Sequence, residues 1–433
     1  MSRSATRRGF LSAAASGGAA LGLGVAAFAA QDAPSRKVIV GTMGQGGRGT
    51  ELARLFQQQP GVEVAYVCDV DRRRAANAAR AVAAAGGREP RAVGDFRRIL
   101  DDKSVDVLVI ATADHWHAPA AILACAAGKH VYVEKPCCHS PREGELLAAA
   151  ARKHRRLVQH GTQRRTWPAQ VEAVAKLRSG VIGRVLMARA VHVGLRTAIG
   201  RGQPAAVPAW LDYDLWQGPA PRRPYRDNLV HYNWHFFWHW GTSEIGNNGV
   251  HKIDVARWGL GVDFPRRVSS CGAKLYFTDD GETPDTHLVN YDFGDKILTF
   301  ENRNWHRRGF EGTAEADIAF YGDRGSLIIS GGSYKVYDPG NQAIGEGSGR
   351  AGDADHIANL VDAIRHGTPL SAGIEVGYRS AVLCHLGSIA HRTGHTLTCD
   401  PQTGRILDDP AAEKLWSREY APGWESQLTA AAL

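Results

Sequence analysis

The chain has 433 residues, of which 44% are hydrophobic and 22% are charged, and this composition suits a globular protein of two domains. The formal net charge is +8, but the basic residues are dispersed, which argues against the clustered Lys and Arg of a nucleic-acid-binding protein. The seven cysteines form no C-x-x-C pair, so we interpret most of them as buried small apolar residues and predict no disulfide framework or zinc site.

The N-terminus has the pattern of an export signal. T-R-R-G-F-L at 6–11 is a twin-arginine signature, an Ala/Gly-rich run covers 13–30, and A-F-A at 27–29 suits cleavage. We predict that residues 1–29 are a signal peptide read by the twin-arginine export machinery, and that the protein is periplasmic. No later segment is long and apolar enough to predict a membrane span after cleavage. The alternatives are an N-terminal membrane anchor or a soluble tail.

A strand, glycine loop and helix follow at 37–59. The β-branched run at 37–41 leads into G-Q-G-G-R-G at 44–49, and a helical pattern follows at 50–59. This loop allows a tight turn, and the helix N-terminus can receive a pyrophosphate. A second strand at 62–68 ends in Asp69, about 20 residues on, where an acid binds ribose hydroxyls. We predict a dinucleotide site, and Asp69 favours NAD.

Three arginines come directly after this acid. One of Arg72, Arg73 and Arg74 could instead accept the additional phosphate of NADP. We prefer to interpret them as a solvated helix face.

The remaining β-α alternation as far as residue 160 predicts a doubly wound parallel sheet. T-A-D-H-W-H at 112–117 follows a buried strand at 105–111, and V-Y-V-E-K-P at 131–136 ends the next strand. Ligands of such sheets bind beyond the carboxyl ends of the strands. Burial at such a place can allow a lysine to exchange a proton near neutrality. The alternative for E-K-P is a surface salt bridge.

From Gly161 the pattern changes. After a helix at 169–178, a strand begins at 183, and a long irregular stretch covers 195–240. A helix at 247–258 precedes alternating strands, which predict an antiparallel sheet with one exposed or partner-covered face. The predicted strands cover 266–277, 286–293, 296–302, 316–321 and 325–330. We expect helices 354–366 and 375–392 to pack on this sheet.

These patterns predict an α/β protein in which a Rossmann domain at 36–160 precedes an α/β domain at 161–400. The second domain is expected to contain an open, mostly antiparallel sheet. Residues 401–433, which have few periodic signals, are expected to form a C-terminal tail.

The motifs above, together with G-V-H-K-I-D-V-A-R-W at 249–258, resemble the Gfo/Idh/MocA family (glucose–fructose oxidoreductase, inositol dehydrogenase and rhizopine catabolism). The resemblance covers about residues 36–395, judged by motif order. It implies NAD or NADP bound tightly, a sugar or cyclitol substrate, and a homodimer or homotetramer built through the second sheet.

The resemblance also implies roles for individual residues. Lys135 is similar to the family's catalytic lysine, and His251 to its acid/base histidine. Asn247 stands where inositol dehydrogenases have an aspartate that pairs with this histidine. An amide can orient an imidazole but stabilises its cation less well, so the proton could pass through Lys135 instead. Asp254 shares a helix face with His251. Without this context, His251 would read as a structural histidine.

The resemblance and the motifs together give two lists of candidate binding residues. The cofactor-binding candidates are Gly44, Gly46, Gly47, Arg48, Asp69, Thr112, His117, Glu134 and Lys135. The carbohydrate-binding candidates are Arg164, Arg165, Trp210, Tyr232, Trp234, His235, Trp238 and Asp254. The aromatic ones could stack on sugar faces, or form an aromatic core under a long loop. We predict no metal site.

Three functions remain open. The first is an exported NAD(P)-dependent oxidoreductase of a sugar, cyclitol or glycoside, in which Lys135 handles the hydroxyl proton. The second is an NAD-dependent glycoside hydrolase that oxidises its substrate transiently with no net redox change. The third is a non-catalytic sugar-binding or assembly protein, against which Lys135 and His251 argue. Release of aglycone without net change in cofactor absorbance would distinguish the second from the first.

Overall fold

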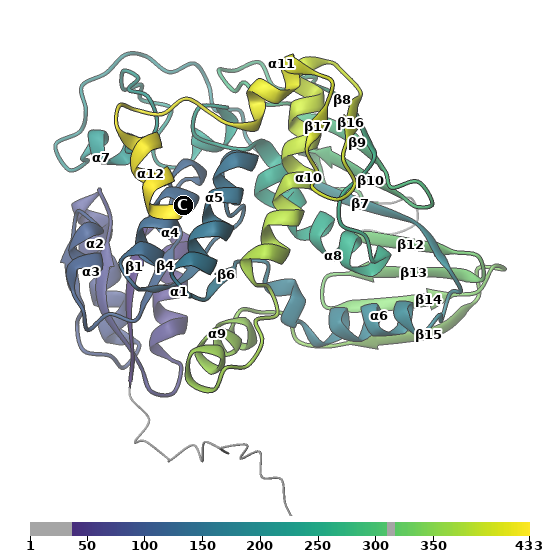
Figure 1. Ribbon diagram of the computed structural model, residues 1–433, viewed down its shortest axis with the longest axis horizontal. Helices are drawn as coiled ribbons and strands as arrows, with labels where there is room; N and C mark the ends of the chain where they lie inside the picture. Colours follow the sequence, from purple (N-terminus) through teal and green to yellow (C-terminus); the bar gives the residue numbers. More distant parts are fainter. Residues whose placement is uncertain (1–36, 310–316) are drawn as a thin grey trace, which may run out of the picture. The chain divides into compact units, whose positions relative to one another are not determined.

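The computed structural model describes residues 37–309 and 317–433 (Figure 1). The predicted signal peptide lies outside the described residues. Across the two described ranges, no helix has both the length and the apolar character needed to cross a membrane.

The first domain contains a six-stranded parallel sheet in the order β3-β2-β1-β4-β5-β6, as counted in the described residues. Its strands are β1 (Val38–Met43), β2 (Val62–Cys68), β3 (Arg91–Val93), β4 (Val107–Ile110), β5 (His130–Val133) and β6 (Val158–His160). The apolar run of β4 is buried along its whole length because helices cover both faces of the sheet. The strand order reverses between β1 and β4, the position at which ligands of such folds bind. The predicted Rossmann architecture is confirmed.

Helices connect these strands and cover the sheet (Figure 1). They are α1 (Gly47–Gln57), α2 (Arg72–Ala84), α3 (Arg97–Asp101), α4 (His117–Ala126) and α5 (Pro141–Lys153). The expectation that helix 354–366 packs on the second sheet is wrong. This helix, α9 (Ala354–His366), buries Ile357, Leu360 and Val361 in the Rossmann core, with Phe56 and Tyr132.

The second domain contains an eleven-stranded sheet within the described part of the chain. Its strands are β7 (Val185–Leu195), β8 (Arg267–Ala273), β9 (Thr286–Asp292), β10 (Ile297–Arg303), β11 (Trp305–His306), β12 (Ile318–Gly322), β13 (Gly325–Ser330), β14 (Ser333–Tyr337), β15 (Ala343–Ser348), β16 (Leu397–Cys399) and β17 (Ile406–Leu407). The sheet is mostly antiparallel, as predicted, but β7 and β10 run parallel. Strand β15 was not predicted because it is an exposed edge strand with no alternating apolar face.

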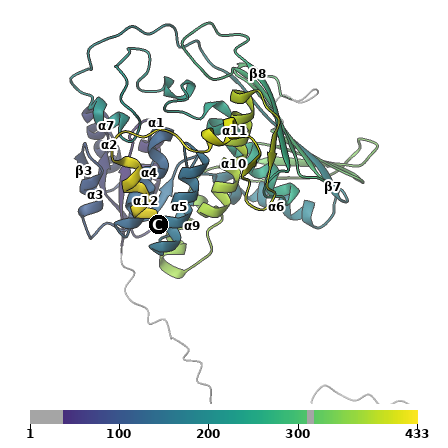
Figure 2. The ribbon, with the colours of Figure 1, turned by 45° about the horizontal axis from the view of Figure 1, so that its top comes forward.

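Helices α6 (Pro168–Arg178), α8 (Val250–Leu260) and α10 (Ile374–Thr393) pack on one face of this sheet (Figure 2). On other strand positions Leu186, Leu288, Ile297 and Tyr321 are exposed, each by more than 40%. The sheet therefore has one packed face and one open face.

Residues 401–433 are more than a tail, because they form α11 (Pro410–Glu413) and α12 (Trp424–Ala432). Helix α12 packs on α4 and α5 of the Rossmann domain, where the ring of Trp424 lies 5.3 Å from that of Trp116 (Figure 1). Helix α10 contacts both α5 and β8. The second half of the chain is thus packed against the first at several places. The cysteines are free, and all are buried except Cys271.

Candidate active site

A cavity of about 590 Å³ lies at the carboxyl ends of β1, β2, β4 and β5. The loop after β1, Asp69 after β2, Thr112 after β4 and Lys135 after β5 all line it. The opposite wall comes from the second domain, through the aromatic segment around 231–235 and the start of α8. Parallel strands end at one edge of the sheet, so residues distant in the sequence meet here.

The glycine loop has the geometry of a phosphate cradle. A Cβ on Gly49 would lie 1.6 Å from the carbonyl oxygen of Gly44, so the turn needs glycine at this close approach. Gly46 caps α1 without a side chain, and a Cβ on Gly47 would meet nothing within 4 Å. The first amides of α1 therefore face an open cavity, and this arrangement fits the pyrophosphate of a dinucleotide.

Asp69 follows β2 and is hydrogen-bonded to the start of the glycine loop. Its carboxylate accepts the backbone N–H of Gln45 at 2.6 Å and that of Asp71 at 2.8 Å. Burial raises the pKa of Asp69, while the two backbone hydrogen bonds and the charge of Arg74 oppose the increase. The carboxylate is held at the cavity wall, a position that suits contact with ribose hydroxyls.

The three arginines after Asp69 differ. Arg72 is exposed, and Arg73 pairs with Asp71 and lies 3.6 Å over the ring of Trp210. Arg74 lines the cavity, and its guanidinium would be 3.3 Å from a Cβ on Gly46. The interpretation of these residues as a solvated face is therefore wrong for Arg74.

Glu134 and Arg48 join the glycine loop to the E-K-P strand end. The Glu134 carboxylate is buried. It accepts a hydrogen bond from Nε of Arg48 at 2.7 Å and another from the backbone N–H of Lys135 at 3.1 Å. Burial raises the pKa of Glu134, but the charges of Arg48 and Lys135 outweigh it and lower the value overall. Arg48 also makes two hydrogen bonds to Asp353, the residue before α9. Glu134 is thus paired with Arg48 and not with the Lys135 ammonium.

The T-A-D-H-W-H segment supplies further wall residues, among them Thr112 and His117. The ring nitrogens of His117 lie 2.6 Å from the carbonyl oxygen of Pro136 and 3.1 Å from that of Thr112. His117 thereby joins the ends of β4 and β5. All nine predicted cofactor-binding residues line the cavity.

Lys135 is held by Asn247. Its Nζ donates to the backbone oxygen of Asn247 at 2.7 Å and to the side-chain oxygen at 3.0 Å. The amide nitrogen of Asn247 donates to Glu244 at 3.3 Å. The amide of Asn247 therefore orients Lys135, whereas the sequence suggested that it orients His251.

His251 lies at the start of α8 and lines the same cavity. Burial, followed by the charge of Lys135, lowers the pKa of His251 well below its ordinary value, so the imidazole is neutral. Its Nδ1 is buried and has no hydrogen-bond partner among the described residues. A neutral ring beside a lysine can accept a hydrogen bond from a hydroxyl.

The remaining wall is aromatic. Tyr232, Trp234 and His235 line the cavity, with His235 stacked on Trp234 at 3.5 Å between ring centroids. Burial lowers the pKa of His235 to about 3. Neutral rings of this kind suit the apolar face of a sugar.

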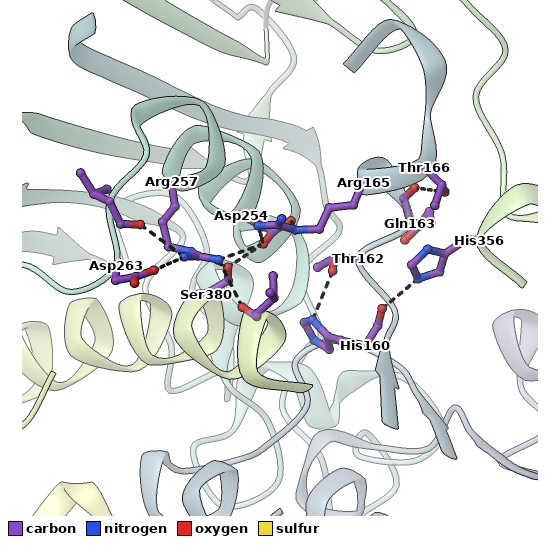
Figure 3. A network of polar contacts seen from close by, with 12 residues as sticks. His160, Thr162, Gln163, Arg165, Thr166, Asp254, Arg257, Asp263, His356 and Ser380 are labelled. Carbon is purple, nitrogen blue, oxygen red and sulfur yellow. Dashed lines mark hydrogen bonds and ion pairs between the residues drawn. The ribbon is translucent and has the colours of Figure 1, made fainter. Parts of the chain in front are cut away.

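Five predicted substrate residues do not line this cavity, which corrects their assignment. Asp254 is fully buried and binds Arg165 through two hydrogen bonds of 2.8 and 2.9 Å, and Ser380 also donates to it (Figure 3). Arg164 pairs with Asp317 at 3.0 Å. Trp210 lines a neighbouring pocket and is stacked against Arg73. Trp238, the further aromatic candidate, lies 5.1 Å from Arg392 and also outside the cavity.

The sequence analysis did not predict several polar residues of the cavity. Arg196, Gln163 and Asn248 line it, and the buried Oε1 of Gln163 has no partner among the described residues. Gln163 is uncharged and belongs to none of the motifs, so no sequence pattern marks it. No pattern marks Arg196, which follows β7 at the start of the irregular stretch. Across the described residues, no group of three or more His, Cys, Asp or Glu side chains could hold a metal ion.

The comparisons with known proteins agree with this geometry. Residues 35–162 match a Gfo/Idh/MocA family model described as "Oxidoreductase family, NAD-binding Rossmann fold". Residues 150–313 match a second model, "Oxidoreductase family, C-terminal alpha/beta domain".

Two curated relatives are similar in sequence. Inositol 2-dehydrogenase 2 of Saccharopolyspora erythraea is 31% identical over 304 residues, which cover 69% of this chain and 73% of the relative. A glycosyl hydrolase family 109 protein of the same organism is 40% identical over 123 residues, covering 28% of this chain and 27% of that protein. Among solved structures, levoglucosan dehydrogenase in complex with NADH and levoglucosan has a TM-score of 0.65 at 20% identity and covers 84% of this chain and 99% of its own. That likeness shows the fold.

Proposed function

This chain belongs to the Gfo/Idh/MocA family of NAD(P)-dependent oxidoreductases, and from that premise we propose that it oxidises a hydroxyl of a sugar, cyclitol or glycoside. The observation that carries the proposal is the position of Lys135. Its ammonium is held by Asn247 between the dinucleotide cradle and the aromatic wall, in one cavity with a neutral His251. A bound nicotinamide would accept the hydride.

Two residues would handle the hydroxyl proton. The Nζ of Lys135 donates to Asn247, and the neutral His251 ring can accept a hydrogen bond from the substrate hydroxyl. The hydroxyl-rich substrate would find further partners in Gln163, Asn248 and Arg196, while Tyr232 and Trp234 would cover its apolar face. Inositol 2-dehydrogenase and levoglucosan dehydrogenase, to which the chain is similar, are named for hydroxyl-rich substrates of this kind.

We propose that the cofactor is NAD and that it is retained tightly. Asp69 supports NAD, and Arg74 beside it keeps NADP as the alternative. The segment at 210–212 supports retention because it is hydrogen-bonded to the chain directly after Asp69. There the backbone N–H of Arg72 donates to Trp210, and that of Asp212 donates to Val70.

A second candidate function is NAD-dependent glycoside hydrolysis without net redox change. The similarity of 123 residues to a glycosyl hydrolase family 109 protein favours it. The covered part is about a quarter of either protein, so the first function is preferred.

Export and oligomerisation complete the proposal. The twin-arginine signature supports transport of a folded protein that carries its cofactor to the periplasm. The open sheet face, with Leu288 and Ile297 exposed, supports a homodimer or homotetramer. Light scattering of wild type and Leu288→Glu tests the oligomer, which the charge should dissociate. Fractionation of cells with Arg7→Lys/Arg8→Lys tests the export, which the change should block.

The function is tested on protein purified from its own compartment without added cofactor. Mass spectrometry after denaturation identifies any released dinucleotide, and aryl glycosides and free sugars are then screened for reduced nicotinamide and for released aglycone. Net reduction supports the oxidoreductase, and aglycone release without net reduction supports the hydrolase. Absence of a dinucleotide and of both activities would leave the sugar-binding protein and overturn the proposal.

A further inference from the structure

Glu244 is a buried carboxylate that neither the motifs nor the comparisons single out. Its side chain is 1% exposed, and it comes directly before the π-helical turn η4 (Ile245–Gly249), which carries Asn247 and leads into α8. One carboxylate oxygen accepts hydrogen bonds from Nε and Nη2 of Arg196, at 3.0 and 2.7 Å. The other accepts the amide nitrogen of Asn248 at 2.7 Å and lies 3.4 Å from Nε2 of His192.

These contacts keep Glu244 ionised. Burial alone would raise the pKa of Glu244, but the hydrogen bond of His192 and the charge of Arg196 lower it below its ordinary value. An ionised carboxylate accepts hydrogen bonds and cannot donate them. Any amide beside it must therefore present its nitrogen.

Asn247 carries such an amide, next to the ionised carboxylate of Glu244. Its nitrogen donates to Glu244 at 3.3 Å, so its oxygen is directed to the opposite side, where it accepts Nζ of Lys135 at 3.0 Å. The reversed amide would place two N–H groups against the ammonium, which is unfavourable. The carboxylate thus selects the amide orientation that holds Lys135.

We propose that Glu244 is a positioning residue that acts through Asn247: by fixing the orientation of this amide, it holds the Lys135 amine in place at the cavity. This inference rests on the role of Lys135 in the proposed function.

Other charged groups also face these residues. Lys135 interacts with the charge of Glu134 and with Asp114, whose pKa is raised by burial, whereas His235 and His251 are neutral. Arg196 balances the charge of Glu244. Removal of the Glu244 charge alone would therefore leave Arg196 uncompensated beside the cavity, which disfavours the ammonium further.

The test uses Glu244→Gln in the full protein, and its first readout needs no substrate. Lys135 is labelled with acetic anhydride at a series of pH values, and peptide mass spectrometry gives the pH of half-modification. We expect that pH to fall by about one unit, and the acidic limb of the turnover profile to move with it. The matched control is Glu301→Gln, which removes a carboxylate paired with Arg189 in the second sheet and should leave both profiles unchanged.

If Glu244→Gln does not fold, Asn247→Leu tests the same relay, because it removes the amide and keeps the Glu244–Arg196 pair. Asn247→Leu should move the half-modification pH in the same direction. Glu244→Asp, which keeps the charge, should give a half-modification pH close to that of wild type. A half-modification pH equal to that of wild type in Glu244→Gln, or in Asn247→Leu, would overturn the inference. Because the labelling does not depend on turnover, failure of the proposed oxidoreductase activity would appear separately.

Discussion

The Nε of Arg48 lies 2.7 Å from Oε1 of Glu134, and this contact joins the dinucleotide loop to the strand end that carries Lys135. The two residues are distant in the sequence, and the pair ties the proposed cofactor site to the proposed catalytic lysine. The same guanidinium reaches Asp353 before α9. One arginine therefore joins three segments of the Rossmann domain.

Arg48→Met should destabilise the protein and weaken dinucleotide binding. It leaves the buried carboxylate of Glu134 and the partly buried carboxylate of Asp353 without this partner, at a cost of about 2 kcal/mol. The cost is moderate because the Arg48 side chain is partly exposed. Denaturant unfolding and NAD titration measure the two effects. The matched control is Arg184→Met, whose side chain is 82% exposed and should cost less than about 0.5 kcal/mol. Equal stability of the two variants would contradict the bridging role.

Lys135→Met should abolish most turnover and leave cofactor binding nearly unchanged. The loss should be about 10³-fold in kcat, because the side chain no longer handles the hydroxyl proton. Initial rates and NAD titration separate the two effects. Lys176→Met on α6, where the lysine pairs with Glu172, is the surface control. Wild-type kcat in Lys135→Met would remove this lysine from the mechanism.

Asp69→Ser should shift the cofactor preference from NAD toward NADP. The carboxylate that would bind the ribose hydroxyls is lost, so NAD affinity should fall about 30-fold, equivalent to about 2 kcal/mol. Arg74 lines the same cavity and can then bind the 2′-phosphate of NADP, because the Asp69 carboxylate no longer competes with that phosphate for the guanidinium. Isothermal titration with both cofactors gives the ratio.

The double variant Asp69→Ser/Arg74→Ala identifies the partner of that phosphate. It should lose whatever NADP affinity Asp69→Ser gains. If the NADP affinity stays the same in both variants, Arg74 does not contact the cofactor phosphate.

His385 should make stability depend on pH. Burial lowers the pKa of His385 from 6.5 to about 4, so the unfolded chain binds more protons than the folded one between these values. Stability therefore rises with pH across this window, and up to about 3 kcal/mol is lost as the pH falls from 6.5 to 4.

Thermal unfolding at pH values between 4 and 7 measures the slope. His385→Gln should flatten it, since glutamine can still donate to the carbonyl oxygen of Cys138 but does not titrate. The exposed His366 provides a control, because His366→Gln should leave the slope as it is. An unchanged slope in His385→Gln would assign the pH dependence to other buried groups.

The sequence alone predicted much of the cofactor side of the cavity. Gly44, Asp69, Thr112 and Lys135 each follow a strand of one parallel sheet, and the ends of such strands meet by rule. Local patterns therefore sufficed to bring these residues together, and the motif order indicated the family. They did not reveal Arg74 in the cavity, because the position of a side chain on a helix face depends on what covers that face.

The substrate side was decided by the tertiary structure. Asp254 shares a helix face with His251, but periodicity does not indicate which element packs on that face, and Arg165 neutralises Asp254 inside the core. In the same way, α9 returns to the Rossmann core, and Glu244 orients Asn247 toward Lys135. Sequence spacing determines which residues share an element, whereas the pairing of buried charges depends on contacts between elements that only the folded chain brings together.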